Sequence, residues 1–220
     1  MSIKVYIVDD HPVVRRGLSQ FIDSKDGFSV CGSAATADVA ITDLNQKQPD
    51  VVIVDINLKG ASGIDLIKAV KSRYKGINML VLSMHDENEY VERAIRAGAR
   101  GYVLKNDSED FILEALKAVM SGKMYLSESL KDRMLESMAW QSSDDGDKSK
   151  SVALLTDREF EIFELIGKGS NTREIAATLS LSVSTVGTYR ERIKNKLNIL
   201  TPNELVKFAI QWVMNNNDKG

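Results

Sequence analysis

The chain has 220 residues, more than the roughly 100 to 150 of a usual domain, so we expect two domains. Its formal net charge of -2 excludes a chain-wide polycation, so any nucleic-acid contact must come from a local basic surface. One cysteine excludes an internal disulfide, and no stretch reaches the roughly 20 apolar residues of a membrane span, so a cytoplasmic protein without a membrane partner is predicted.

The first half of the chain alternates short apolar runs with helical patterns. The apolar runs are KVYIVDD, FSVCG, DVVIVDI, NMLVLSM and GYVLK. Because they lack strict polar alternation, they are typical of parallel strands that are covered on both faces. Between them, apolar residues recur at helical spacing, as at Val14, Leu18 and Ile22. Five such units predict an α/β fold over residues 1–122, a flavodoxin-like, doubly wound parallel sheet of five strands.

Polar residues stand where four of these strands end. The first strand ends in Asp9 and Asp10, the third in Asp55, the fourth in Ser83 and the fifth in Lys105. Ligands of a doubly wound sheet bind at the carboxyl ends of its strands, so these groups are expected to share one crevice. Three carboxylates there repel one another unless a cation intervenes, and oxygen ligands suit a hard divalent ion. The sequence therefore predicts a Mg²⁺ (or Mn²⁺) site.

Asp55 is the candidate for chemistry in this crevice. A carboxylate can attack phosphorus to give an aspartyl phosphate, and the Ser83 hydroxyl and the Lys105 ammonium can bind phosphoryl oxygens. Each acid alone could equally be a solvated loop or capping residue, but the set at matching strand ends favours a site. His11 and His85 lie in the same loops without metal-ligand spacing, and we interpret them as ordinary loop residues.

Residues 1–122 resemble the receiver domain of bacterial two-component response regulators. The residues that match the family's motif are Asp9, Asp10, Asp55, Asn57, Ser83, Tyr102 and Lys105. The resemblance implies that a sensor histidine kinase phosphorylates Asp55 and that the backbone carbonyl of Asn57 completes the metal site. It also implies that Ser83 and Tyr102 form the switch, with Tyr102 turning inward after phosphorylation. One departure is Lys59, which stands where the family has a proline.

The second half begins with a connecting segment. Residues 123–153 are predicted to contain an amphipathic helix, followed by a polar stretch at 141–151. Beyond it, residues 154–220 show no strand pattern and predict a small all-α domain of four short helices. Thr156 and Glu159 form a capping-box pattern at the first of them. A second helix at 171–180, a tight turn and a third helix give the helix-turn-helix arrangement.

The third helix of this domain is predicted to enter the DNA major groove. Val186, Ile193 and Leu197 define its buried side, and the bases on the helix outnumber its one acid, Glu191. The predicted DNA-binding residues are Ser184, Thr185, Gly187, Thr188, Tyr189, Arg190, Glu191, Arg192 and Lys194. Among them, we assign Thr185, Tyr189 and Arg190 to phosphates, and Thr188, Glu191 and Arg192 to base edges.

The motifs LTDRE, NTREIAATLSLSVSTV and KNKLNI are similar to the LuxR-type output domain. With the receiver, they make nearly the whole chain resemble a NarL/FixJ-type response regulator. Gly187 and Tyr189 depart from the Lys and His that the family often has there. Such domains bind double-stranded DNA as homodimers, and the last helix offers a stripe for pairing, although part of that stripe must be core. The stripe consists of Leu205, Phe208, Ala209 and Trp212.

These observations predict a transcription regulator that is controlled by phosphorylation and is not an enzyme. Two alternatives remain open. One is a magnesium-dependent phosphatase on the same fold, although a second acid is missing two residues after the nucleophile, where Asn57 stands. The other is a DNA-binding regulator whose receiver serves protein contact alone, independently of phosphate.

Overall fold

The structure is a computed structural model that describes residues 2–85, 88–140 and 152–217. It forms two compact units, Met1–Met134 and Leu135–Gly220. The predicted amphipathic helix is present as α6 (Glu128–Trp140), and the boundary between the units falls inside it. The predicted polar stretch at 141–151 lies outside the described residues.

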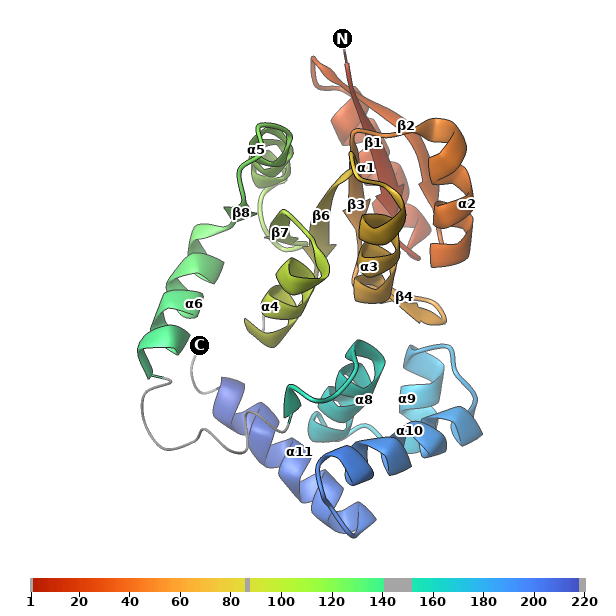
Figure 1. Ribbon diagram of the computed structural model, residues 1–220, viewed down its shortest axis with the longest axis vertical. Coiled ribbons are helices and arrows are strands. Elements are labelled where there is room, and N and C mark those ends of the chain that lie inside the picture. Colours follow the sequence, from red (N-terminus) through yellow and green to blue (C-terminus); the bar gives the residue numbers. More distant parts are fainter. Residues whose placement is uncertain (1, 86–87, 141–151, 218–220) are drawn as a thin grey trace. The chain divides into compact units, whose positions relative to one another are not determined.

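A parallel sheet with the order β2-β1-β3-β6-β7-β8 forms the centre of the N-terminal unit (Figure 1). Its strands are β1 (Ile3–Val8), β2 (Phe28–Ala34), β3 (Val51–Val54), β6 (Asn78–Ser83), β7 (Gly101–Leu104) and β8 (Tyr125–Leu126). The first five are the predicted runs, and their flavodoxin-like order is confirmed. The predicted count of five is wrong, because β8 adds a sixth parallel strand beside β7. A strand of two residues is too short to produce a readable apolar pattern.

Helices cover both faces of this sheet (Figure 1). They are α1 (Pro12–Asp23), α2 (Ala37–Lys47), α3 (Gly63–Arg73), α4 (Asn88–Ala97) and α5 (Glu109–Met120). Leu18 and Ile22 of α1 share one apolar core with Ile112 and Leu116 of α5. On the other side, α3 contacts both α2 and α4. All four residues of β3 are buried, so the apolar runs pack on both faces as their composition predicts.

Backbone hydrogen bonds continue past the strand ends and hold the following residues in register. The Asp55 amide donates to the Val8 carbonyl at 2.8 Å, and the Lys105 amide donates to the Ser83 carbonyl at 2.7 Å. The Asp9 amide donates to the Ala34 carbonyl at 3.2 Å. The residues that the sequence places at the strand ends therefore start from fixed, neighbouring backbone positions.

A small antiparallel hairpin that the sequence did not predict follows Asp55. It pairs β4 (Asn57–Leu58) with β5 (Ala61–Ser62), and Gly60 in the turn has a φ of 77°. Gly63 then begins α3, where a Cβ would collide with the carbonyl oxygen of Asp55. The loop is thus folded tightly against the backbone of Asp55, and only glycine permits this approach.

Besides the end of α6, four principal helices lie in the described part of the C-terminal unit. They are α8 (Asp157–Gly167), α9 (Thr172–Thr178), α10 (Val183–Lys196) and α11 (Pro202–Asn217). The predicted capping box is confirmed, since the Thr156 amide donates to Glu159 Oε2 at 2.8 Å and the Glu159 amide donates to Thr156 Oγ1 at 3.4 Å. The sequence predicts the tight turn before α10 at residues 181–184, but the turn ends earlier, because Ser182 caps the helix and Ser184 already lies in its first turn.

Aromatic packing between α8 and α11 builds the core of this unit. Phe160 and Phe163 of α8 contact Trp212 of α11 with ring centroids 5.3 and 5.7 Å apart, and Phe163 also contacts Phe208. In the same stripe Leu205 is fully buried. The predicted stripe is therefore used as core, while its role in pairing two subunits stays a prediction. Across the described parts of both units, no helix combines the length and hydropathy that a membrane span requires.

Candidate functional site

Three charged side chains from distant parts of the sequence meet where β1, β3 and β7 end. Lys105 Nζ donates to Asp9 Oδ2 at 2.7 Å and to Asp55 Oδ2 at 2.6 Å. The side chains of Asp9 and Asp55 are only 3% and 4% exposed, and that of Lys105 is 11% exposed. The lysine thus bridges two buried carboxylates that would otherwise repel each other.

The electrostatics of this group follow from its burial. Burial raises the pKa of Asp55 above its ordinary value, because it disfavours the charged carboxylate, and Lys105 only partly offsets this effect. Burial alone would lower the pKa of Lys105, but the charges of Asp55 and Asp9 outweigh it and raise that pKa. Lys105 is therefore held as a cation, and the Asp55 carboxylate still carries a desolvation cost that a further cation would relieve.

The carboxylates have the composition and spacing of a divalent-cation site. Ligand atoms of Asp9, Asp10, His11 and Asp55 all lie within 4.8 Å of one another. Asp10 Oδ1 is buried and accepts no hydrogen bond from the described residues, and His11 Nδ1 lies 2.7 Å from it. A buried carboxylate oxygen without a hydrogen bond, beside two other carboxylates, fits a hard cation such as Mg²⁺. The residues present therefore fit the ion that the sequence predicted.

Ser83 and Tyr102 are both buried, and the partly buried His85 forms hydrogen bonds with both of them. The His85 amide donates to Ser83 Oγ at 3.1 Å, and Tyr102 Oη donates to the His85 carbonyl at 2.7 Å. The expectation that Tyr102 turns inward only after phosphorylation needs correction, because its side chain is already fully buried here.

His85 also reaches the loop after the phosphoacceptor candidate. Its Nε2 lies 2.9 Å from Asn57 Nδ2, and its ring packs on Tyr90 with a centroid distance of 4.2 Å. The Asn57 amide in turn donates to Asp55 Oδ1 at 3.3 Å. A chain of contacts therefore runs from Asp55 through Asn57 and His85 to Tyr102. The sequence predicts His85 and His11 to be ordinary loop residues, and nothing in their local pattern indicates these contacts.

The predicted DNA-binding residues lie along α10, with Val186 and Ile193 as its fully buried residues. Ser182 Oγ accepts from the Thr185 amide at 3.0 Å and fixes the start of the helix. Arg192 stands over the ring of Tyr189 at 5.8 Å, and Lys196 is drawn away to Glu159 at 2.6 Å. The helix therefore presents a polar surface whose cations stand on either side of its exposed face.

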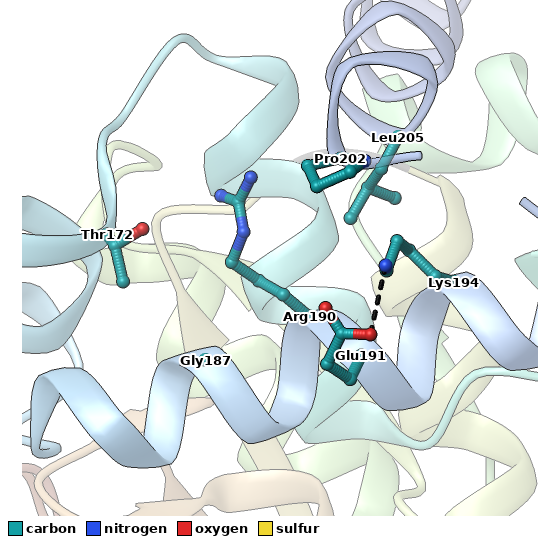
Figure 2. Close-up of a pocket in the computed structure, with 7 residues that line it drawn as sticks. All are labelled: Thr172, Gly187, Arg190, Glu191, Lys194, Pro202 and Leu205. Carbon is teal, nitrogen blue, oxygen red and sulfur yellow. Dashed lines mark ion pairs between the residues drawn. The ribbon is translucent and has the colours of Figure 1, made fainter. Parts of the chain in front are cut away.

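One pocket, of about 170 Å³, lies beside this helix (Figure 2). Its lining residues come from α9, α10 and α11 and are Thr172, Gly187, Arg190, Glu191, Lys194, Pro202 and Leu205. Figure 2 shows the guanidinium of Arg190 between Thr172 and Pro202, and Lys194 reaching Glu191. The ion pair between Lys194 Nζ and Glu191 Oε2 measures 2.9 Å.

Family models match both units. Residues 5–117 match the response regulator receiver domain, and residues 153–209 match the bacterial regulatory proteins of the luxR family. The transcriptional regulatory protein MctR of Rhizobium johnstonii is 35% identical over 209 residues, which cover 95% of this chain and 94% of the relative. The oxygen regulatory protein NreC of Staphylococcus carnosus is 33% identical over 211 residues, which cover 95% and 97%.

Solved structures agree with these relationships. The RcsB response regulator of Salmonella typhimurium is 25% identical, with a TM-score of 0.65 over 96% of this chain and 98% of that one. A structure of two RcsB dimers bound to two parallel DNAs is 25% identical, with a TM-score of 0.60 over 94% and 98%. With both units matched in order, this chain belongs to the response regulators of two-component systems that join a receiver domain to a LuxR-type DNA-binding domain.

Proposed function

We propose that this chain is a transcription regulator whose binding to double-stranded DNA is controlled by phosphorylation of Asp55. The observation that carries the proposal is the buried pair of ion contacts from Lys105 Nζ to Asp55 and Asp9, at 2.6 and 2.7 Å. A cation that already bridges the carboxylates is placed to bind a phosphoryl oxygen once Asp55 is esterified.

The phosphoryl donor in this proposal is a phosphohistidine of a sensor histidine kinase. A carboxylate oxygen of Asp55 attacks phosphorus, the new P–O bond forms as the P–N bond breaks, and the donor's imidazole leaves. Asp9, Asp10, Asp55 and the backbone carbonyl of Asn57 would hold Mg²⁺ or Mn²⁺. When bound, that ion would neutralise charge on the transferring group.

In this proposal, Ser83 and Tyr102 transmit the effect of phosphorylation from Asp55 to the surface of the receiver. Phosphorylation adds roughly -1.5 to -2 charges, and the Ser83 hydroxyl can donate to a phosphoryl oxygen. The His85 amide is bonded to Ser83, and the His85 carbonyl is bonded to Tyr102, so a shift of Ser83 also moves the partner that holds the tyrosine. Because Tyr102 is already buried, phosphorylation would stabilise this inward position rather than create it.

The output in this proposal is a homodimer on DNA, which forms when the receiver is phosphorylated or when DNA is bound. The bases that flank the exposed face of α10, and the dimers of the related RcsB on DNA, support this assignment. We assign no enzymatic turnover to the chain. Asn57 stands where a phosphatase on this fold would need a second acid, and an amide cannot exchange that proton.

A phosphorylation assay of the full chain with a radiolabelled small acyl phosphate and Mg²⁺ tests the proposal. The wild type is expected to take up at most one hydroxylamine-sensitive phosphoryl group per chain, and Asp55→Asn is expected to take up none. Asp65→Asn is the control, because Asp65 is an exposed acid on α3 with a side chain that is 59% exposed. Uptake that persists in Asp55→Asn would contradict the proposal.

A further inference from the structure

The exposed face of α10 carries one stripe of four side chains. Ser184, Thr188, Glu191 and Asn195 are all exposed, and their spacing of four, three and four residues places them in line along the helix. The fully buried Val186 and Ile193 lie roughly opposite Glu191. Three members of the stripe are uncharged, so the only charge at the centre of this face is the Glu191 carboxylate.

Cations stand at both edges of the stripe rather than in it. Arg190 and Lys194 lie on one side and Arg192 lies on the other, whereas Lys196 is turned away to Glu159. This arrangement suits a helix in the major groove, because the two phosphate backbones run along the edges of the groove and the base edges form its floor. The phosphates repel a carboxylate at the centre of this face. The partner that suits Glu191 is therefore a hydrogen-bond donor on the base edges of the groove floor.

Glu191 is held in place from inside the domain. Its side chain is 64% exposed, whereas that of Lys194, which pairs with it at 2.9 Å, is only 12% exposed. Lys194 lines the pocket of Figure 2 together with Pro202 and Leu205 of α11. By contrast, the surface pair Glu128–Lys131, with the same spacing, leaves its side chains 82% and 44% exposed. Lys194 is therefore held against the core, and its ion pair restricts the orientation of the Glu191 carboxylate.

Gly187, one turn before Glu191, leaves the approach to this carboxylate open. A Cβ added at Gly187 would have no neighbour within 4 Å, so packing does not require glycine there. Glycine inside a helix is less favourable than alanine, so its presence here points to a close approach by something outside the domain. A base edge that reaches Glu191 would pass this open position.

We propose that Glu191 determines DNA specificity by accepting a hydrogen bond from the N4 amino group of a cytosine in the major groove, and that Lys194 positions it. A carboxylate only accepts, and guanine and thymine present acceptors there that would repel it. Adenine presents its N6 donor beside the N7 acceptor, whereas cytosine presents the N4 donor alone. The inference rests on the proposed function, because it assumes that α10 enters the groove.

Selection of bound sequences from a randomised duplex library, with the full chain, tests this inference. The wild type should select cytosine at one position of each half-site, and changing that base should weaken binding roughly 5- to 150-fold. Glu191→Gln should lose this preference and shift it toward adenine, because an amide can bond both N6 and N7. Glu128→Gln is the matched control, since it removes the same charge from a Glu–Lys pair outside α10.

Lys194→Met separates positioning from a general charge effect. If Lys194 positions Glu191, this variant weakens the base preference at the cytosine position more than the base preference at any other position. A base preference that is unchanged in Glu191→Gln, with only a uniform gain in affinity for all sequences, would overturn the inference. A wild type that binds no duplex at all would contradict the proposed function itself, so the two failures are distinguishable.

Discussion

The receiver unit and the DNA-binding unit gather their charged groups in opposite ways. In the receiver, Lys105 meets Asp9 and Asp55 across 96 and 50 residues of chain, and all three side chains are nearly buried. In the DNA-binding unit, the charges stand along one helix of 14 residues and frame an exposed face. The first site exists only when the sheet is assembled, whereas the second is the surface of one helix. Changes at the first site should therefore cost folding stability, whereas changes on the exposed face of α10 should alter DNA binding without such a cost.

The largest effect is expected from Lys105→Met in the receiver. This change keeps the apolar stem but leaves Asp9 and Asp55 buried without their cation, which should cost about 3 to 5 kcal/mol of stability. Hydrogen exchange of the β1 and β3 amides in the full chain measures that loss locally. Added Mg²⁺ should restore part of it, because another cation then offsets the same carboxylates.

Lys131→Met provides the comparison for that measurement. Lys131 pairs with Glu128 at 2.7 Å, but both side chains are well exposed, so its loss should cost about 1 kcal/mol or less. If the two lysine variants were equally stable, the idea that burial makes the receiver site part of the fold would fail.

The next largest difference in stability is expected between alanine substitutions at two helical glycines of the DNA-binding unit. A Cβ at Gly167 would lie 2.5 Å from the carbonyl oxygen of Ala209 and 2.5 Å from Val213 Cγ2, so Gly167→Ala should cost about 1 to 3 kcal/mol. Gly187→Ala meets open space and should instead stabilise the unit by up to about 1 kcal/mol. Thermal unfolding of the full chain measures both changes, and shifts of the same sign would contradict the assignment of Gly187 to an outside partner.

Much of the receiver site could be predicted from the sequence because parallel strands align their carboxyl ends. Asp9, Asp55 and Lys105 each follow an apolar run, and this alone places their side chains at the same edge of the sheet. The remaining features depend on contacts that no local pattern records. His85 acquires its place through Asn57, 28 residues away, and through the ring of Tyr90. The two-residue strands β4, β5 and β8 carry too few residues for any period to be visible.

A smaller effect, dependent on pH, is expected from Glu159→Gln in the capping box of α8. Burial would raise the pKa of Glu159, but the Lys196 ammonium at 2.6 Å and the Thr156 amide outweigh it and lower that pKa. The carboxylate therefore stabilises the fold fully above its unfolded pKa of about 4.3, and this contribution fades as pH falls through the lower, folded value. At pH 7 the variant should lose about 1 to 2 kcal/mol. Unfolding curves at several pH values measure the difference, which should narrow on acidification, and a constant difference would show that the charge of Glu159 is not involved.

The smallest effect is expected from Lys59→Pro, beside the receiver site. Lys59 and Gly60 form the turn between β4 and β5, and Gly60 has the positive φ of 77° that the second turn residue of a type II turn requires. Proline suits the first turn residue, so the change should stabilise the receiver by about 0.4 to 1 kcal/mol by restricting the unfolded chain. Denaturant unfolding and the phosphorylation assay test it together. Because the strand ends rather than this turn hold Asp9, Asp55 and Lys105, phosphoryl uptake should be unchanged; a loss of uptake in a stable variant would mean that the receiver site depends on its nearest loop as much as on the assembled sheet.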